Sequence, residues 1–196
     1  MRPNNADTSW VRPFNAETGA NFQKNLGFIE GNSWQYTFMV AHDTKGLIRL
    51  MGGEQAYSNQ LQKVFDLGQF DMTNEPNIGY PYLFNYVSDQ EWRTQKKVSE
   101  LIKTHFRNTP DGLPGNDDTG TMSAWLIYSM MGLYPVSPAD PIYAVTTPVF
   151  DKIVIQLDSR KYDQSQLVIE REGKGVIKQI KISEGSNKSV IENPSE

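Results

Sequence analysis

The sequence contains no cysteine among its 196 residues. Disulfide bonds, cysteine ligands for metals and thiol nucleophiles are therefore excluded. Histidine is nearly absent too: only His42 and His105 are present, and neither lies in the H-E-x-x-H pattern of many zinc hydrolases. Both histidines have the neighbours expected of helix-surface or core residues. Carboxylates, amides, hydroxyls and aromatic rings remain as the candidate functional groups.

Positive charge is also sparse. Lys and Arg never form a run longer than two, and the formal net charge is −4. Because nucleic-acid binding needs a basic patch to contact phosphates, no nucleic-acid partner is expected. The uncharged stretch 119–139 is about as long as a membrane span, but its apolar part ends at Gly132. It predicts a buried helix with an exit loop, and no membrane span.

Apolar residues at helical spacing predict about five helices in the first part of the chain. Asp43 is expected to cap the second helix, a capping box at residues 88–91 to start the fourth, and Gly132 to end the fifth. The fifth helix is apolar nearly all round, which is typical of a helix buried in a larger all-α assembly. The predicted helices cover residues 33–42, 44–51, 54–67 and 121–131, with the fourth running from the capping box at residues 88–91 to about residue 106.

The composition changes after Pro141. The stretches VFDKIVIQL, QLVIER and VIKQIKI are β-branched and alternate, which predicts three to four strands, and the last ten residues resemble a ragged tail. The fold class is thus mainly α with a C-terminal β segment. Paired helices separated by polar and aromatic loops suggest an α/α toroid, or a part of one because five helices would not close it.

Three loops beside predicted helix ends carry carboxylates next to aromatic residues. Several carboxylates facing an aromatic pocket suit glycoside hydrolysis, because one acid protonates the leaving oxygen while another activates water. Two neighbouring carboxylates repel each other, so the pKa of one of them rises and that group more easily stays protonated. The loops are FIEGNSWQY with Glu30, TNEPNIGYPY with Asn74 and Glu75, and GLPGNDDTG with Asn116, Asp117 and Asp118.

Each of these residues also has a purely structural interpretation. An acidic residue before a helix commonly caps it or interacts with its dipole, which applies to Asp118 and to Glu30. Residues 74–76 are equally typical of a plain turn. The acidic turn does not have the spacing of a calcium-binding helix–loop–helix motif.

Three longer blocks, EGNSWQYTFMVAHDTKGLIRLMGG, NEPNIGYPYLFNY and GLPGNDDTGTMSAWLIYSMMGLYPVSPADPIY, resemble successive signature segments of glycoside hydrolase family 92. The opening MRPNNADTSWVRPF is similar to a segment inside the family's catalytic domain, so the resemblance covers roughly residues 1–157. It implies a calcium-dependent, exo-acting, inverting α-mannosidase. The implied substrates are terminal mannosides, α-1,2-linked above all, in mannose-rich glycans such as N-glycans.

The resemblance also implies an N-terminal β-sandwich followed by an (α/α)6 toroid. Residues 1–140 would be the C-terminal part of that toroid, and residues 141–196 a β-strand segment that packs on the sandwich. The sandwich itself would be missing from this chain and would be its partner. Family members are often secreted, periplasmic or cell-surface proteins of bacteria, and no signal peptide is recognisable here, which leaves the location open.

Residue roles carry over by the same resemblance. Glu30 matches the general acid, while Asp117 and Asp118 match the acidic pair that supplies the general base, with the choice between them left open. Asn74 and Glu75 are expected to be calcium ligands close to the sugar. The residues expected to shape the substrate pocket are Trp34, Gln35, Tyr36 and Asn116.

Two other functions stay open from the sequence. The chain is also compatible with a non-catalytic module that binds a mannoside or calcium. It is equally compatible with a stable folding fragment that has no function of its own.

Overall fold

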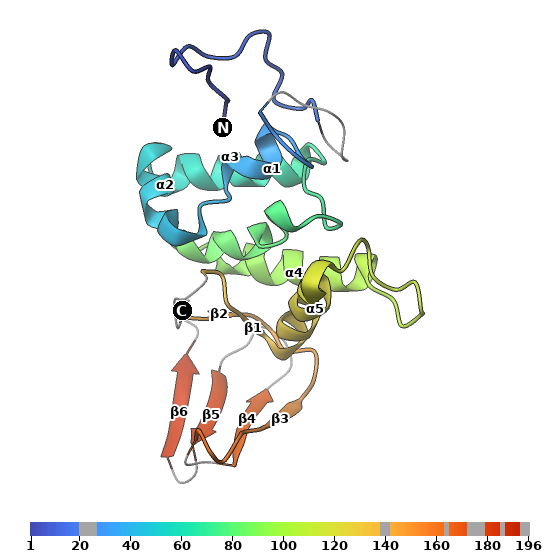
Figure 1. Ribbon diagram of the computed structural model, residues 1–196. Helices are drawn as coiled ribbons and strands as arrows, with labels where there is room; N and C mark the ends of the chain where they lie inside the picture. Colours follow the sequence, from blue (N-terminus) through green and yellow to red (C-terminus); the bar gives the residue numbers. More distant parts are fainter. Residues whose placement is uncertain (20–26, 138–141, 163–164, 172–178, 185–186, 193–196) are drawn as a thin grey trace.

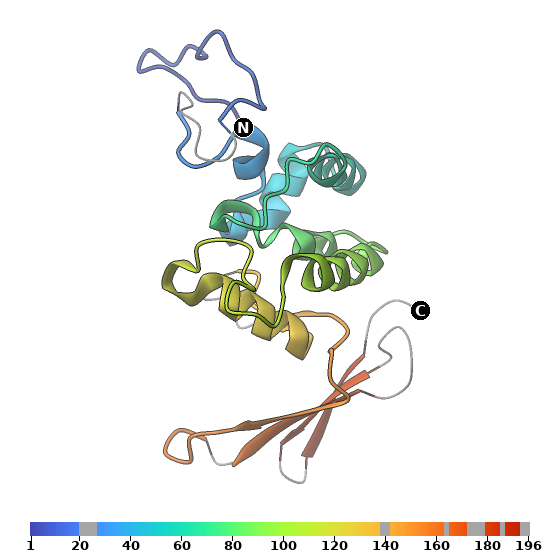
Figure 2. The same ribbon diagram turned by 90° about the vertical axis from the view of Figure 1, so that its right-hand side faces the viewer.

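The computed structural model describes residues 1–19, 27–137, 142–162, 165–171, 179–184 and 187–192. A helical part and a four-stranded sheet lie at opposite ends of the molecule (Figures 1 and 2). The predicted fold class is confirmed, because helices dominate the first part of the chain and short strands follow near its end.

Within the described ranges the chain forms five α-helices, at nearly the predicted places. Only the first differs clearly, since it ends at Thr37 and a 3-10 turn at Ala41–Asp43 follows it. The Asp43 carboxylate then accepts a hydrogen bond from the Gly46 N–H (2.8 Å), which starts the next helix as expected. The helices are α1 (Ser33–Thr37), α2 (Thr44–Leu50), α3 (Glu54–Asp66), α4 (Glu91–His105) and α5 (Thr121–Met131).

The stretch between α3 and α4 was expected to be a loop and instead contains two 3-10 helices, η2 (Glu75–Asn77) and η3 (Tyr80–Tyr86). Each has a proline in its first turn, where the missing N–H costs nothing. The η3 segment is largely buried and contributes Tyr80, Tyr82, Leu83 and Phe84 to the core. Many of the aromatic residues therefore fill the core and do not line a pocket.

The predicted capping box at residues 88–91 is wrong. Helix α4 begins after Gln90, whose side chain makes no capping hydrogen bond. Asp89 has a left-handed backbone (φ 59°), which delays the helix start, and the Ser88 N–H donates instead to Glu54 Oε2 (2.9 Å). A capping box does form at α1, where the Asn32 and Gln35 side chains each bind the other's backbone N–H.

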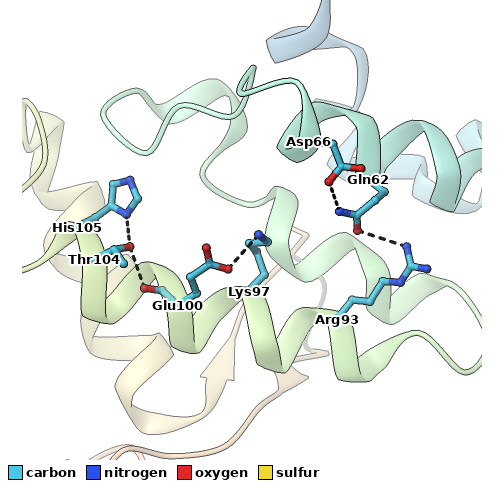
Figure 3. A network of polar contacts seen from close by, with 7 residues as sticks. All are labelled: Gln62, Asp66, Arg93, Lys97, Glu100, Thr104 and His105. Atoms are coloured by element: carbon cyan, nitrogen blue, oxygen red, sulfur yellow. Dashed lines mark hydrogen bonds and ion pairs between the residues drawn. The ribbon is translucent and has the colours of Figure 1, made fainter.

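One hydrogen bond drawn in Figure 3 joins helices α3 and α4, and further polar contacts lie within each helix. Arg93 donates to Gln62 of α3 (3.3 Å), and Lys97 lies over the Phe65 ring while it pairs with Glu100 (3.0 Å). The cations on this face of α4 therefore all have partners. Farther along, the exposed His105 contacts only the neighbouring Thr104 among the residues drawn, which agrees with its expected surface position.

Helix α5 ends at Gly132, whose left-handed backbone (φ 76°) stops the helix as predicted. In the described part of the chain one side of α5 is buried, and burial of its other side in a larger all-α assembly stays a prediction. Met122, Trp125 and Ser129 are buried, whereas Ile127 on another face is 58% exposed. One side of α5 packs on α4, on Tyr82 of η3 and on the short strand that follows α5.

The strands form two antiparallel sheets in the described ranges. Strand β1 (Leu133–Tyr134) pairs with β2 (Ala144–Val145) directly after α5. The larger sheet has the order β3 (Lys152–Gln156), β4 (Gln166–Arg171), β5 (Gln179–Glu184) and β6 (Asn187–Glu192). The ragged tail expected over the last ten residues is wrong for β6, because a backbone ladder pairs it with β5. The final four residues lie outside the described ranges.

Candidate functional site

Glu30 has an unusual backbone that two side chains hold in place. Its φ of 59° is left-handed, a conformation that costs a non-glycine residue free energy and is concentrated at functional sites. The Tyr36 hydroxyl donates to the carbonyl oxygen of Ile29, and the Asn74 side-chain amide donates to the carbonyl oxygen of Glu30 itself. The peptide groups on both sides of Glu30 are thus fixed, and its side chain is exposed.

The nearby Glu30 carboxylate also affects the pKa of Tyr36. Burial raises the pKa of the Tyr36 phenol, and the nearby negative charge of Glu30 raises this pKa further. The Tyr36 hydroxyl therefore stays neutral and can donate a hydrogen bond beside the carboxylate.

The second loop adds a carboxylate oxygen with no partner. The Asn74 side-chain oxygen accepts from the Glu75 N–H (3.1 Å), which holds the start of η2. Glu75 Oε1 is buried, and no described residue forms a hydrogen bond with it. Leaving a buried carboxylate oxygen unsatisfied is costly, which marks it as a position for a ligand, a water or a cation.

The third loop lies directly against the second. A Cβ atom placed on Gly115 would be 2.5 Å from the carbonyl oxygen of Thr73, closer than real Cβ contacts allow. Glycine thus permits the turn before the aspartate pair to touch the residue before Asn74. The second loop therefore connects the Glu30 loop to the aspartate loop, and all three lie on one side of the helical part, at the right in Figure 1.

Asp117 is held at the start of α5. Its Oδ1 accepts from the Ser123 N–H (2.9 Å) and its Oδ2 from the Ser123 hydroxyl. The N–H groups in the first turn of a helix lack partners within it, so Asp117 satisfies one of them. The side-chain bond from Ser123 and then the backbone bond keep the pKa of the Asp117 carboxyl below its ordinary value.

Replacing Ser123 by Ala is expected to raise the pKa of Asp117 toward its ordinary value of 3.8. A lowered folded-state pKa means that ionised Asp117 stabilises the fold above the ordinary pKa, and that this stabilisation disappears as pH falls through the lowered pKa. The variant should therefore lose more stability near neutral pH than in strong acid. NMR titration of the side-chain carboxyls and urea unfolding at both pH values test this. Ser159→Ala, at an exposed site, is the control, and an unchanged Asp117 pKa would contradict the assignment.

Asp118 differs from its neighbour. Its carboxylate is exposed and forms no hydrogen bond with a described residue, whereas its carbonyl oxygen accepts from the hydroxyls of Thr119 and Thr121. Thr119 has a left-handed backbone (φ 51°) directly after it. The two aspartates, which the sequence could not distinguish, therefore have different environments: one is held by the helix, and the other is available to solvent.

Only some of the residues expected to bind substrate have side chains available beside the carboxylate loops. Tyr36 lies beside Glu30, and Asn116 is exposed in the aspartate loop. Gln35 is 4% exposed, and its side-chain oxygen is used in the α1 capping box. Trp34 lines a separate cavity of about 440 Å³, together with residues that include Met1. Their roles in substrate binding stay predictions.

The oxygen atoms available in the second loop can be compared with the ligands that a calcium ion needs. The ion takes about six to eight oxygen ligands. The unpartnered Glu75 oxygen fits it, and the Asn74 side-chain oxygen retains a second lone pair. In the described ranges, no three His, Cys, Asp or Glu side chains come close enough together to hold a metal. The chemistry of the donors fits calcium, and water, backbone or sugar oxygens would complete the shell.

Sequence reasoning missed two residues that shape the site, Ser123 and Gly115. A serine near the start of a helix that follows an aspartate is a detectable signal for Ser123. Nothing in the sequence signals that Gly115 lies against Thr73, because the contact joins segments that are distant in the chain.

Two of the solved structures that resemble this chain come from a bacterium. The chain matches a family GH92 α-mannosidase from Bacteroides thetaiotaomicron, in complex with mannoimidazole, with a TM-score of 0.77 and 26% identity, covering 89% of this chain and 25% of that one. A family GH92 inverting mannosidase from B. thetaiotaomicron VPI-5482 matches with a TM-score of 0.74 and 27% identity, covering 89% of this chain and 26% of that one.

A fungal relative is similar at the sequence level. An uncharacterized secreted glycosidase of Arthroderma benhamiae is 32% identical over 127 residues, which are 65% of this chain and 16% of the relative. The chain therefore spans about a quarter of the length of these solved structures and less than a fifth of the curated relative. No helix in the described part of the chain is long and apolar enough to cross a membrane.

The family profile covers more of the chain than either kind of relative. The glycosyl hydrolase family 92 catalytic domain matches residues 1–194. The match includes the β segment after residue 140 and all three carboxylate loops. The resemblance inferred from the three motifs is thereby confirmed, and this chain belongs to glycosyl hydrolase family 92.

Proposed function

We propose that this chain supplies the catalytic carboxylates of an α-mannosidase that removes terminal α-1,2-linked mannose from mannose-rich glycans such as N-glycans. The observation that carries the proposal is the series of contacts among the three loops. The Asn74 side chain binds the backbone of Glu30, and the aspartate loop packs through Gly115 against Thr73. The similarity to family GH92 mannosidases supports the reaction class.

The proposed mechanism is inverting and uses two carboxyl groups. Glu30 donates its proton to the glycosidic oxygen as the bond from that oxygen to the anomeric carbon breaks. A water on the opposite face of the sugar attacks the same carbon, and its proton passes to a carboxylate. Carboxyls about 6.5–9.5 Å apart leave room for this water.

Within the aspartate pair, Asp118 is the proposed base. Both carboxylate oxygens of Asp117 already accept hydrogen bonds from Ser123, which makes Asp117 a weaker proton acceptor. The Asp118 carboxylate is exposed beside it and can approach a water molecule. Asp117 then serves to position the loop and to add negative charge near the base.

Calcium is proposed as the cofactor, with Glu75 and Asn74 as its ligands from this chain. When bound, the ion would supply a positive charge that holds sugar hydroxyls and favours a distorted ring. The Asn74 side chain would then connect the ion's position to the backbone of Glu30.

The division into residues 1–140 as toroid and 141–196 as a β segment that packs on an N-terminal sandwich remains part of the proposal. Three apolar side chains on this segment are about half exposed, which supports a docking partner there. They are Val149, Phe150 and Val154. Neither the 440 Å³ cavity nor a larger one beside α4 is lined by Glu30, Glu75 or the aspartates. Residues from such a partner would be needed to enclose the sugar.

Mannose release from α-1,2-mannobiose tests the proposal. The chain is assayed alone and together with the N-terminal region, with calcium and then with EDTA. Calcium-dependent release, by the chain alone or by the two parts together, supports the function. Calcium binding is measured independently as a rise in melting temperature with calcium and not with magnesium. If mannosides bind but are not hydrolysed in any combination, the non-catalytic module is the correct alternative.

A further inference from the structure

A second cavity lies away from the three carboxylate loops. It encloses about 580 Å³ between one face of α4 and the segment that follows β2. Thr147 closes one wall, since its hydroxyl donates to Gln95 of α4 (3.3 Å). The residues that line the cavity include none of the residues placed in the proposed active site.

The charges around this cavity are all of one sign. Lys96, Lys103 and Arg171 line it, and no Asp or Glu does, although the whole chain carries a net charge of −4. On the α3-facing side of α4, Arg93 donates a hydrogen bond to Gln62 and Lys97 forms an ion pair with Glu100. Across the described ranges, in contrast, Lys96 and Lys103 form no ion pair. A low-dielectric wall with unpaired cations favours an anion.

The cavity wall also contains buried donors without partners. Thr146 is 1% exposed, and its hydroxyl has no hydrogen-bond partner among the described residues. The Arg171 Nε is unpartnered in the same way, although another nitrogen of that guanidinium pairs with Asp151. Buried polar groups are nearly always satisfied in folded proteins, so two orphan donors among the residues that line the cavity indicate a missing acceptor.

The rest of the lining is apolar and includes one large ring. Trp92 is 55% exposed at the start of α4, and the Arg93 guanidinium lies 5.3 Å from its ring centre. Val98 and Ile102 form the apolar surface beside it. An indole ring next to hydroxyl and amide groups suits a ligand that is itself a ring with polar edges.

We propose that this cavity binds a sugar-sized ring that carries a carboxylate or a phosphate group. The anionic group contacts Lys96 and Lys103, and an oxygen of the ligand accepts from Thr146. The ring lies against Trp92 and the apolar wall. The site is distinct from the carboxylate loops, and its existence does not depend on the proposed mannosidase activity.

Calorimetric titration of the full chain with three matched probes tests the site. Glucuronate carries a carboxylate, glucose 6-phosphate carries a phosphate, and glucose is the neutral control. We expect at least one anionic probe to bind about tenfold more tightly than glucose, because its charge adds a hydrogen-bonded ion pair with a lysine. Whichever anion binds more tightly identifies the group that the cavity prefers. Equal binding of all three, or no binding, overturns the proposal.

Substitutions in the cavity lining test whether the anionic probe binds there. Lys96→Gln combined with Lys103→Gln changes exposed side chains on one helix and should weaken the anionic probe about tenfold or more. Lys63→Gln, on the exposed surface of α3, should bind like the parent. Thr146→Val adds a test of the buried hydroxyl, and the double lysine variant decides the question if that variant does not fold. Unchanged affinity in the double variant overturns the assignment of this cavity.

Discussion

Glu30→Gln is expected to lower kcat/KM for α-1,2-mannobiose by about 10²–10⁴-fold, the usual contribution of a general acid. Glutamine has the same shape as glutamate and keeps the left-handed backbone and its two bracing hydrogen bonds. It has no acidic proton to donate to the glycosidic oxygen. The loss would therefore report proton transfer and not a collapsed loop.

Comparing two leaving groups makes this prediction sharper. A dinitrophenyl α-mannoside has a leaving group that departs without protonation, so the same substitution should reduce its hydrolysis far less than that of the disaccharide. The measurement uses a preparation that hydrolyses both substrates. Glu100→Gln, an exposed carboxylate paired with Lys97, provides the matched control and should leave both rates unchanged. Equal losses for the two substrates would contradict the role of acid and indicate a binding role.

Trp125→Ala is expected to lower the free energy of unfolding by about 3–5 kcal/mol, the range for truncating a large buried aromatic side chain. Trp125 is 1% exposed, stacks on Phe106 with ring centres 5.6 Å apart, and contacts Tyr82 edge to face at 6.2 Å. Its indole N–H donates to the carbonyl oxygen of Ile78 (2.9 Å). One side chain thus joins α5 to the end of α4 and to the segment between η2 and η3.

Urea unfolding measures this loss, and two further variants separate its parts. Trp92→Ala removes an exposed indole and should cost less than about 1 kcal/mol, as surface changes usually do. Trp125→Phe keeps an aromatic ring for stacking but leaves the Ile78 carbonyl oxygen without its donor, so it should fall between the two. If Trp125→Ala costs no more than Trp92→Ala, then α5 is not anchored to the second loop in the way the structure indicates.

The fold class was predictable because the helices obey local rules. Helices α3, α4 and α5 have periodic apolar residues, and Asp43 and Gly132 mark ends that depend on nearby atoms alone. The start of α4 was not predictable. The Ser88 N–H binds Glu54, a residue 34 positions away, and this long-range contact replaced the local capping box.

The candidate site was predictable in its residue types and less so in its geometry. Short sequence motifs located Glu30, Glu75 and the aspartates. The contact between Ser123 and Asp117 spans six residues and follows a local pattern that was overlooked, whereas no local rule indicated that the Asn74 side chain would reach the backbone of Glu30. The second contact joins residues 44 positions apart and depends on the packing of η2, which the sequence pattern does not encode locally.

The bracing of Glu30 has a consequence for how this sequence can change over generations. Tyr36 and Asn74 hold the peptide groups on either side of Glu30, so the role proposed for Glu30 depends on three positions. A substitution at Asn74 would be epistatic to Glu30 and would resemble loss of the acid itself. Second-site suppressors of such a change should be new hydrogen-bond donors to the Glu30 carbonyl oxygen, whereas glycine at position 30 would relax the backbone and remove the carboxyl group.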